Sequence, residues 1–242
     1  MNDEAERLSG GNLGEVVRQG DTVLRQSGDW TPAVHRLLGE LIAAGVSGVP
    51  KPLGLSDDGR EVLSFVEGTV PAYPMPVWVW SESALDSSAR LLRRLHDVTA
   101  RLDIPGPWRS PVREPAEVIC HNDFATYNLV FDGDQVVGVI DWDFASPGPR
   151  LWDLVYLAYR IVPLSQADRA DGFTDRQRHH RLRRLLAAYG TGADSREISA
   201  LLQERLRDLA TFSDLMAARL DKPELAEHAD VYRHDAAQLH LG

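Results

Sequence analysis

The chain has 242 residues, of which 36 are acidic and 26 are Lys or Arg, so its formal net charge at pH 7 is −10. Hydrophobic residues make up 43% and charged residues 26% of the sequence, which is ordinary for a globular protein with a sizeable core. The acidic balance argues against a nucleic-acid or anionic-membrane partner, because both repel a negatively charged surface, and it is compatible with a cationic ligand.

Cys120 is the only cysteine, so no internal disulfide can form and a reducing compartment is expected. The first residues lack the basic and apolar regions of a signal peptide. No apolar run approaches the roughly 18 residues that span a membrane. We therefore predict a cytoplasmic protein without a membrane partner; the sequence carries no signal of its oligomeric state.

The chain begins with a pattern of short strands. Residues 10–14 form a glycine-rich turn that contains Gly10 and Gly11. Strands are predicted over residues 15–18 and 22–25, on either side of a Gly-Asp turn. The glycines of the first turn could let backbone N–H groups approach phosphate oxygens. They do not fit G-x-G-x-x-G, however, and a simple glycine turn between strands is the more common explanation.

A helix and a hairpin complete this first part. Pro32 fits the first turn of a helix with Thr31 as its cap, and Gly45 fits the helix end. Two further strands are predicted over residues 51–55 and 61–66, joined by an Asp-Asp-Gly turn.

The pattern changes after Glu67, where a proline-rich run from 71 to 76 is typical of a linker. We predict an N-terminal lobe over residues 1–67 and a larger C-terminal lobe over residues 68–242. The second lobe is mostly helical, with helices predicted at 81–102, 151–162, 175–189, 195–220 and 223–239. The fold class is therefore α+β, with two lobes, and we expect a ligand cleft between them.

Residues 118–142 carry most of the functional signal. Strands predicted over 129–131 and 136–140 flank the turn Asp132-Gly133-Asp134 and form a hairpin. Because a hairpin brings its outer ends together, Asn128 and Asp141 should lie close to each other, with Asp123 one loop away. These oxygen-bearing side chains suit a hard cation such as Mg²⁺ that also holds phosphate oxygens.

Each of these residues has a simpler reading. Asp123 is predicted to be a catalytic base, but an isolated loop aspartate often only caps its own backbone. Asn128 and Asp141, the predicted metal ligands, are also usual residues at the ends of strands. Asp141-Trp142-Asp143 further matches the short D-x-D pattern of nucleotide-sugar transferases, which leaves His121 to Asn128 unexplained. Asp143 is either a second metal contact or an acid that orients the loop.

The chain has only two lysines, Lys51 and Lys222, and neither lies on the strand that follows the glycine turn. Arg25 is the basic residue in that place, and we predict that it binds phosphate oxygens, with a solvated strand end as the alternative. A carboxylate on the next helix should orient this cation. Glu40 is the only acid there and His35 lies nearer the helix start, and the sequence does not choose between them.

Other polar residues near the hairpin have structural readings. His121 is expected to fix the loop with its ring, and Cys120 is expected in the core rather than as a nucleophile. Asp153 either favours the start of its helix or accepts N–H bonds from the loop that carries Asp123. Hydrolase chemistry has no support, because the sequence lacks G-x-S-x-G and its histidines lack zinc-ligand spacing.

The arrangement H-x-D-x-x-x-x-N, a hairpin and an aspartate resembles the aminoglycoside phosphotransferase and choline kinase-like family. The resemblance is carried by residues 120–130, 139–143 and 148–154, with weaker matches at 9–11, 23–25 and 65–68. It implies a protein-kinase-like fold in two lobes. In that family the equivalent of Asp123 is the base, Asn128 and Asp141 bind Mg²⁺, and Asp153 braces the catalytic loop.

The resemblance also implies that Phe65, Val66 and Glu67 form the hinge whose backbone meets adenine. Three departures stand out: an arginine replaces the usual lysine, a helical glutamate partner is not evident, and the chain is short for the family.

The leading hypothesis is a kinase that uses ATP (GTP is possible) and Mg²⁺ to phosphorylate a hydroxyl of a small, possibly cationic molecule. Acid-rich stretches at Asp168 to Asp175 and Asp221 to Asp230 could receive ammonium groups, but solvated helix ends explain them more simply. The alternative is a catalytically weak or inactive nucleotide-binding protein that keeps the fold.

Overall fold

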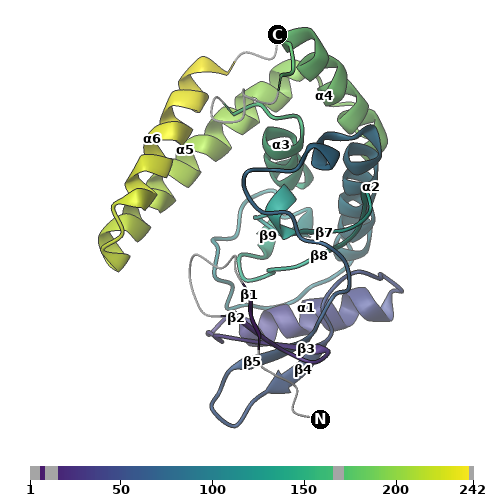
Figure 1. Cartoon of the computed structure of the whole chain (residues 1–242), viewed down its shortest axis with the longest axis vertical. Coiled ribbons are helices and arrows are strands. Elements are labelled where there is room, and N and C mark those ends of the chain that lie inside the picture. The colour runs from purple at the N-terminus through teal and green to yellow at the C-terminus, as the bar shows by residue number, and fades with distance from the viewer. Residues whose placement is uncertain (1–5, 9–15, 166–171, 240–242) are drawn as a thin grey trace.

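A computed structural model gives the structure of the chain and describes residues 6–8, 16–165 and 172–239. A small lobe with a β-sheet lies below a larger, mostly helical lobe in Figure 1. This arrangement confirms the predicted α+β fold with two lobes. Gly10 and Gly11, predicted to contact phosphates, lie outside the described residues.

The N-terminal sheet has five antiparallel strands in the order β1-β2-β3-β5-β4. The strands are β1 (Glu6–Leu8), β2 (Val16–Gln19), β3 (Thr22–Arg25), β4 (Pro52–Leu55) and β5 (Glu61–Ser64). Sequence patterns predicted all of them except β1. The register places Arg25, at the end of β3, directly opposite Glu61, at the start of β5.

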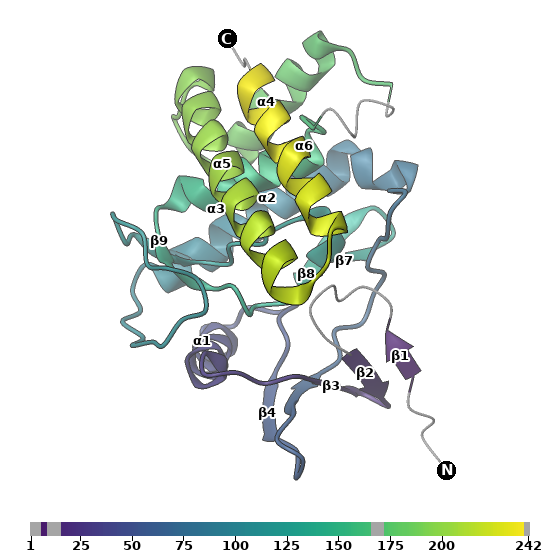
Figure 2. The same cartoon turned by 90° about the vertical axis from the view of Figure 1, so that its left-hand side faces the viewer.

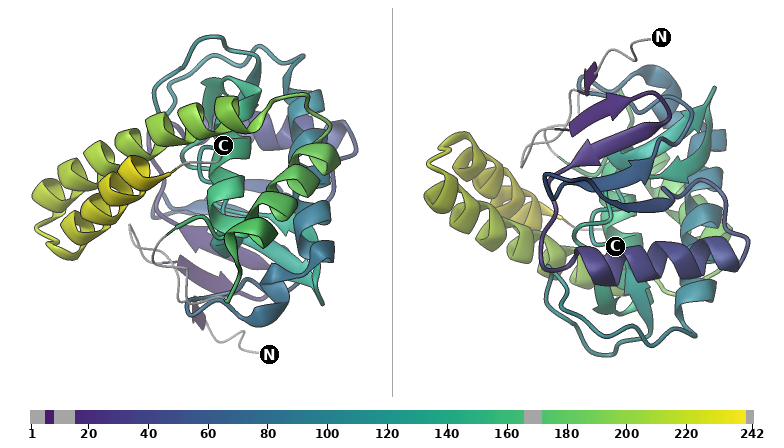
Figure 3. Two further views of the ribbon diagram at one scale, coloured as in Figure 1. Left: turned by 90° about the horizontal axis from the view of Figure 1, so that it is seen from above. Right: turned by 90° about the horizontal axis from the view of Figure 1, so that it is seen from below.

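Helix α1 (Thr31–Ala43) connects β3 to β4 and packs beside the sheet, as Figure 3 shows from below. Its buried face includes Val34, Leu37, Leu38 and Leu41. The prediction that Thr31 caps this helix is wrong. Thr31 is the first helical residue, and its hydroxyl accepts a hydrogen bond from the backbone N–H of Gly28 at 2.9 Å instead of from a helical N–H.

The C-terminal lobe is built on helices around two small strand pairs. The helices are η1 (Val77–Trp80), α2 (Glu82–Thr99), η2 (Thr126–Asn128), α3 (Arg150–Ile161), α4 (Asp175–Tyr189), α5 (Ser195–Leu220) and α6 (Glu224–Gln238). The predicted hairpin is formed by β7 (Leu129–Asp132) and β8 (Gln135–Val139). The second pair, β6 (Val118–Cys120) with β9 (Ser146–Gly148), was not predicted as a pair.

The two lobes meet backbone to backbone near Gly48. The carbonyl of Gly48 accepts a hydrogen bond from Val139 N at 2.8 Å. A Cβ added to Gly48 would lie 2.0 Å from the carbonyl oxygen of Val137, and its φ of +79° also favours glycine. On the chain between the lobes, Thr69 already pairs with Phe131 of the hairpin. We therefore propose Glu67–Gly68 as the lobe boundary.

One continuous core joins both lobes, from Leu37 on α1 through Leu92 on α2 to Tyr156 on α3. Helices α5 and α6 form an antiparallel pair that crosses the front of the helical lobe in Figure 2 and projects from it in Figure 3. Among the described residues, no helix combines the length and apolar character that a membrane span requires.

Candidate active site

The loop after β6 is held by the buried carboxylate of Asp153 on α3. Asp153 Oδ2 accepts the backbone N–H of His121 at 2.6 Å, and Oδ1 accepts that of Asn122 at 2.8 Å. Asn122 has a φ of +64°, a conformation that costs free energy and persists only where the surroundings fix it. Of the two readings of Asp153, the structure supports the brace of the loop.

The His121 ring has the structural role expected from the sequence. Its Nε2 donates to the carbonyl of Ile140 at 3.0 Å, and its Nδ1 accepts the backbone N–H of Asp123 at 3.2 Å. Burial lowers the pKa of His121, which favours the neutral ring that these two bonds require. The ring therefore ties the loop to the end of β8.

Asp123 is held from two sides. Tyr127 OH donates to its Oδ1 at 2.8 Å, and Asn128 Nδ2 donates to its Oδ2 at 2.8 Å. Burial, followed by the negative charge of Asp141, raises the pKa of Asp123 to about 6. A half-buried carboxylate with a raised pKa and a fixed orientation is suited to accept a proton near neutral pH.

Asn128 directly precedes β7 and Asp141 follows β8, so both lie at the outer ends of the hairpin as predicted. Ile140 N donates to Asn128 O at 2.9 Å there. Asn128 uses its Nδ2 twice, toward the side chain and the carbonyl of Asp123. No donor from the described residues reaches Asn128 Oδ1. The Asp141 side chain is 42% exposed, and the Asp141 backbone has a φ of +63°. One amide oxygen and one open carboxylate are donors that fit a hard divalent cation.

Arg25 is surrounded by carboxylates. Its Nε donates to Glu61 at 2.5 Å, its Nη1 to Asp141 at 2.9 Å, and its Nη2 to Asp143. Burial alone would lower the pKa of Arg25, but the three carboxylates raise it above its ordinary value. Each guanidinium nitrogen thus already has an anionic partner within the protein.

The expectation that a helical carboxylate orients Arg25 is wrong. The partner is Glu61 on β5, which the sheet register places opposite Arg25. His35 of α1 supports it indirectly, with Nε2 2.9 Å from Glu61 Oε1. Burial by itself would raise the pKa of Glu61, but its bonds to His35 and Arg25 keep the pKa below the ordinary value. Glu40 is exposed on the same helix.

Asp143 is bound by two arginines. Its Oδ1 accepts from Arg25 and its Oδ2 from Arg109 Nη1 at 3.0 Å. Arg109 comes from the proline-rich connection before β6 and stacks between the rings of Trp30 and Phe144 at 4.4 and 4.5 Å. Because arginines occupy both oxygens, the structure supports the orienting role of Asp143 over a metal contact. No local sequence pattern predicts that Arg109 reaches this site.

The predicted hinge, Phe65 to Glu67, follows β5. Phe65 N donates to Asp21 O at 2.7 Å, and Arg18 lies 3.6 Å above the Phe65 ring centroid. Within the described part of the chain, no backbone hydrogen bond engages Val66 or Glu67. The contact of these residues with a nucleotide base stays a prediction.

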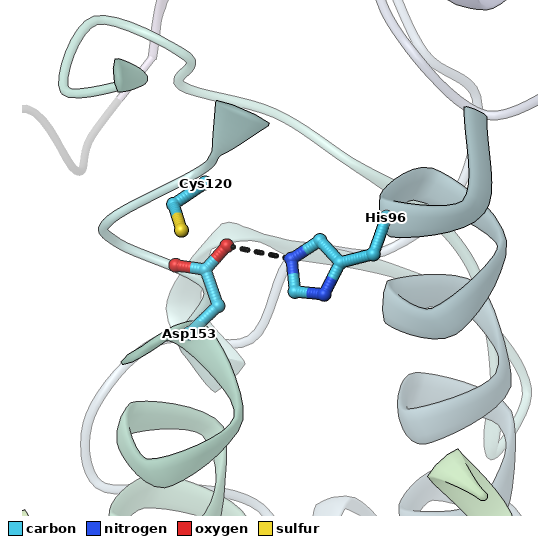
Figure 4. Close-up of side chains that lie close together, drawn as sticks. All are labelled: His96, Cys120 and Asp153. Carbon is cyan, nitrogen blue, oxygen red and sulfur yellow. Dashed lines mark hydrogen bonds and ion pairs between the residues drawn. The ribbon is translucent and has the colours of Figure 1, made fainter. Parts of the chain in front are cut away.

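A buried group of His96, Cys120 and Asp153 lies behind the loop (Figure 4), with potential ligand atoms within 4.8 Å of one another. Asp153 Oδ2 accepts from His96 Nε2 at 3.2 Å in addition to its bonds to the loop. The Cys120 thiol donates to Pro149 O at 3.3 Å, and burial raises its pKa well above the ordinary value. All three side chains therefore have hydrogen-bond partners within the protein, and the group supports the loop. Cys120 lies in the core, as expected.

Comparison with known proteins identifies the family. A model of the phosphotransferase enzyme family (APH) matches residues 107–201. The trifolitoxin immunity protein of Rhizobium leguminosarum bv. trifolii is 36% identical over 207 residues, which cover 81% of this chain and 77% of that protein. The chain belongs to the APH phosphotransferase family. As a member of this family it is a phosphotransferase.

Solved structures agree on the fold at low sequence identity. An amicoumacin kinase in complex with AMP-PNP, Ca²⁺ and amicoumacin has a TM-score of 0.72 at 13% identity, with 100% of this chain and 90% of that chain covered. An ethanolamine kinase of Plasmodium vivax has a TM-score of 0.71 at 13% identity, with coverages of 97% and 82%. The APH phosphotransferase fold therefore extends over the whole chain.

Proposed function

We propose that this phosphotransferase transfers the γ-phosphoryl group of ATP, with GTP as the alternative donor, to a hydroxyl group of a small molecule. The observation that carries this proposal is the placement of Asp123: a half-buried carboxylate fixed by Tyr127 and Asn128, beside the oxygen donors of Asn128 and Asp141. The solved kinases with the same fold, one of them bound to AMP-PNP and Ca²⁺, support it.

In the reaction, the acceptor oxygen forms a bond to the γ-phosphorus while the bond from that phosphorus to the β–γ bridging oxygen breaks. Asp123 orients the acceptor hydroxyl and takes its proton, and the nucleoside diphosphate leaves. Asn128 and Asp141 would hold Mg²⁺, which neutralises charge on the phosphate oxygens when bound. Phe65 to Glu67 would receive the base, and Arg25 would counter phosphate charge.

A second candidate is a nucleotide-binding protein without turnover. The observation that favours it is the complete engagement of Arg25 by Glu61, Asp141 and Asp143, at the place where a lysine is usual in relatives. This candidate predicts that the protein binds nucleotide but releases no diphosphate with any acceptor.

The test is diphosphate release from ATP and from GTP, with and without Mg²⁺, across a panel of hydroxyl compounds. Asp123→Asn should lower turnover by about 10²- to 10⁴-fold and leave nucleotide binding intact. Asp134→Asn, an exposed aspartate in the hairpin turn, is the matched control and should behave as wild type. Intact nucleotide binding with equal, negligible release in wild type and Asp123→Asn across the whole panel would favour the second candidate.

A further inference from the structure

Arg160 of α3 lies in a cage of phenol rings on the Tyr127 side of Asp123. Its guanidinium carbon is 4.9 to 5.8 Å from the centroids of four rings, which belong to Tyr127, Tyr156, Tyr159 and Tyr232. These rings come from the catalytic loop, from α3 and from α6. The helical pair that projects from the lobe thus supplies one wall of the cage.

A chain of hydrogen bonds links Arg160 to the proposed base. Tyr127 OH donates to Asp123 at 2.8 Å and lies 2.9 Å from Tyr156 OH. Arg160 donates to Tyr156 OH through Nη2 at 3.1 Å and to Tyr232 OH at 2.9 Å. Three hydrogen bonds of ordinary length span at most about 9 Å, so one small molecule can reach both ends of this chain.

The charge of Arg160 has no carboxylate partner among the described residues. Burial raises the pKa of Tyr127 and of Tyr156 above the ordinary value, so both phenols stay neutral at physiological pH. Asp235 is the acidic residue of this region on α6, and its carboxylate instead accepts from Tyr159 OH at 2.6 Å and from Ser165 Oγ at 2.8 Å. The guanidinium is thus a half-buried cation whose hydrogen-bond partners are neutral phenols, and across these phenols its charge partly offsets the rise that burial causes in the pKa of Asp123.

One nitrogen of this guanidinium, Nη1, remains open to a ligand. Arg160 Nη1 has a single long contact, 3.5 Å to the hydroxyl of Tyr73, and the Tyr73 side chain is exposed to solvent. The other two nitrogens are engaged, since Nε donates to Tyr156 OH and Nη2 donates to Tyr156 OH and Tyr232 OH. Nη1 can therefore donate a charge-assisted hydrogen bond to one oxygen of a carboxylate or a phosphate, which are stronger acceptors than a phenol.

We propose that Arg160 is a specificity-determining residue that binds an anionic oxygen group, a carboxylate or phosphate, of the phosphoryl acceptor, whose hydroxyl is then presented to Asp123. This proposal rests on the proposed function and names its acceptor class. Aromatic cages bind ammonium groups through the faces of their rings, but here the guanidinium of the chain itself fills the cage and repels a cationic acceptor. The acidic net charge of the whole protein is therefore no guide to the charge of its substrate.

The test compares acceptors that differ only in charge, first by binding. One set is γ-hydroxybutyrate, its amide and the corresponding amino alcohol; the other is glycerol phosphate and glycerol. Calorimetry in the presence of AMP-PNP and Mg²⁺ should show wild type binding the anionic member of at least one set about 10- to 100-fold more tightly than its neutral partner. The set that shows the preference distinguishes carboxylate from phosphate.

Three variants test the residue. Arg160→Gln should abolish the preference, and Arg160→Lys, which keeps the charge but loses the planar guanidinium and its bonds to the phenols, should retain part of it. Arg184→Gln removes the same charge from α4, where Arg184 pairs with Asp86 and Glu82, and should keep the full preference. A purely structural role would instead lower the melting temperature and weaken all acceptors equally. Arg160→Lys keeps the test valid if Arg160→Gln does not fold.

Turnover measured on the same sets separates this inference from the proposed function. The inference is overturned if neither set shows tighter binding of the anion, or if the preference survives in Arg160→Gln. Anion binding without any diphosphate release would uphold the site and count against the kinase reaction. Release with neutral or cationic acceptors only would uphold the kinase and reject the anion site.

Discussion

Arg25 and Arg160 are two arginines of the candidate active site with opposite surroundings. Around Arg25, three carboxylates meet two guanidiniums, its own and that of Arg109. Around Arg160, neutral phenols surround a cation that has no carboxylate partner in the described part of the chain. The first cluster has negative charge in excess, which suits the proposed metal cation, whereas the second has positive charge in excess, which suits the proposed anionic group of the acceptor.

The largest expected effect concerns the cation side. Asp141→Asn should lower turnover by about 10²- to 10³-fold and raise the Mg²⁺ concentration needed for half-maximal rate, because it removes the open carboxylate. Asp143→Asn is the matched change on a carboxylate that two arginines already occupy, and it should leave the Mg²⁺ requirement nearly unchanged. Equal shifts of the Mg²⁺ titration in both variants would break the distinction between a metal ligand and an orienting acid.

The next effect concerns the loop between the two clusters. Asp153→Asn should lower the free energy of unfolding by about 3 kcal/mol, because two loop N–H groups lose their buried anionic acceptor. Asp97→Asn, which removes a carboxylate from exposed pairs with Arg93 and Arg150, should cost less than about 1 kcal/mol. Urea unfolding followed by circular dichroism measures both.

The same variant has a defined pH dependence. Burial would raise the pKa of Asp153, but its bonds to His96 and His121 hold the folded-state pKa below the ordinary value. Its contribution to stability is therefore present above the unfolded pKa near 4 and lost as pH falls through the lower folded pKa. The stability gap between wild type and Asp153→Asn should narrow below about pH 4. A gap that stays constant down to acid unfolding would contradict this assignment.

A smaller effect is expected at Arg25. Arg25→Gln should raise the KM for the nucleotide by about 10-fold, because carboxylates then face the phosphates without a cation between them. Arg25→Lys should recover part of that loss. Arg60→Gln is the control, because Arg60 forms an ion pair with the exposed Asp58 and with no other acid in the described part of the chain. An unchanged nucleotide KM in Arg25→Gln would mean that Arg25 serves only to hold the carboxylates.

The smallest expected effect concerns Tyr127, which connects Asp123 to the phenols around Arg160. Tyr127→Phe removes one hydrogen bond to Asp123 and the bridge to Tyr156, and it should lower kcat by about 3- to 10-fold. The acceptor KM should change little, in contrast to Arg160→Gln, where KM carries the effect. Steady-state kinetics with a single anionic acceptor distinguish these outcomes.

Local patterns were enough to predict the elements that form the catalytic half of the site. The hairpin β7–β8 follows from turn residues between β-branched runs, and it brings Asn128 and Asp141 together whatever the rest of the chain does. Most helix bounds followed from apolar spacing and turn residues, with Asp175–Tyr189 and Ser195–Leu220 predicted as observed. The roles of Asn128 and Asp141 as metal ligands remain predictions.

The missed residues all depend on contacts between distant segments. Glu61 meets Arg25 because β5 pairs with β3 across an intervening helix and strand, a register that no local pattern specifies. The residues next to Arg109 and Arg160 in the sequence form no recognisable motif. The proposed roles of these two arginines depend on side chains from distant segments that surround them in the folded chain. The cap at Thr31 failed for a related reason: Gly28 N competes for the same hydroxyl.

The residues of the proposed transfer reaction and part of the proposed acceptor site come from different segments of the chain. Asp123, Asn128 and Asp141 all lie in the segment between β6 and β9, whereas Tyr232 of the cage is contributed by the last helix, which packs mainly on α5. Helix α5 also contacts the loop, since Arg205 donates a hydrogen bond to the carbonyl oxygen of Asn122. A replaced α6 would therefore change the cage wall that Tyr232 forms around Arg160, while α5 would keep its bond to the loop that carries Asp123.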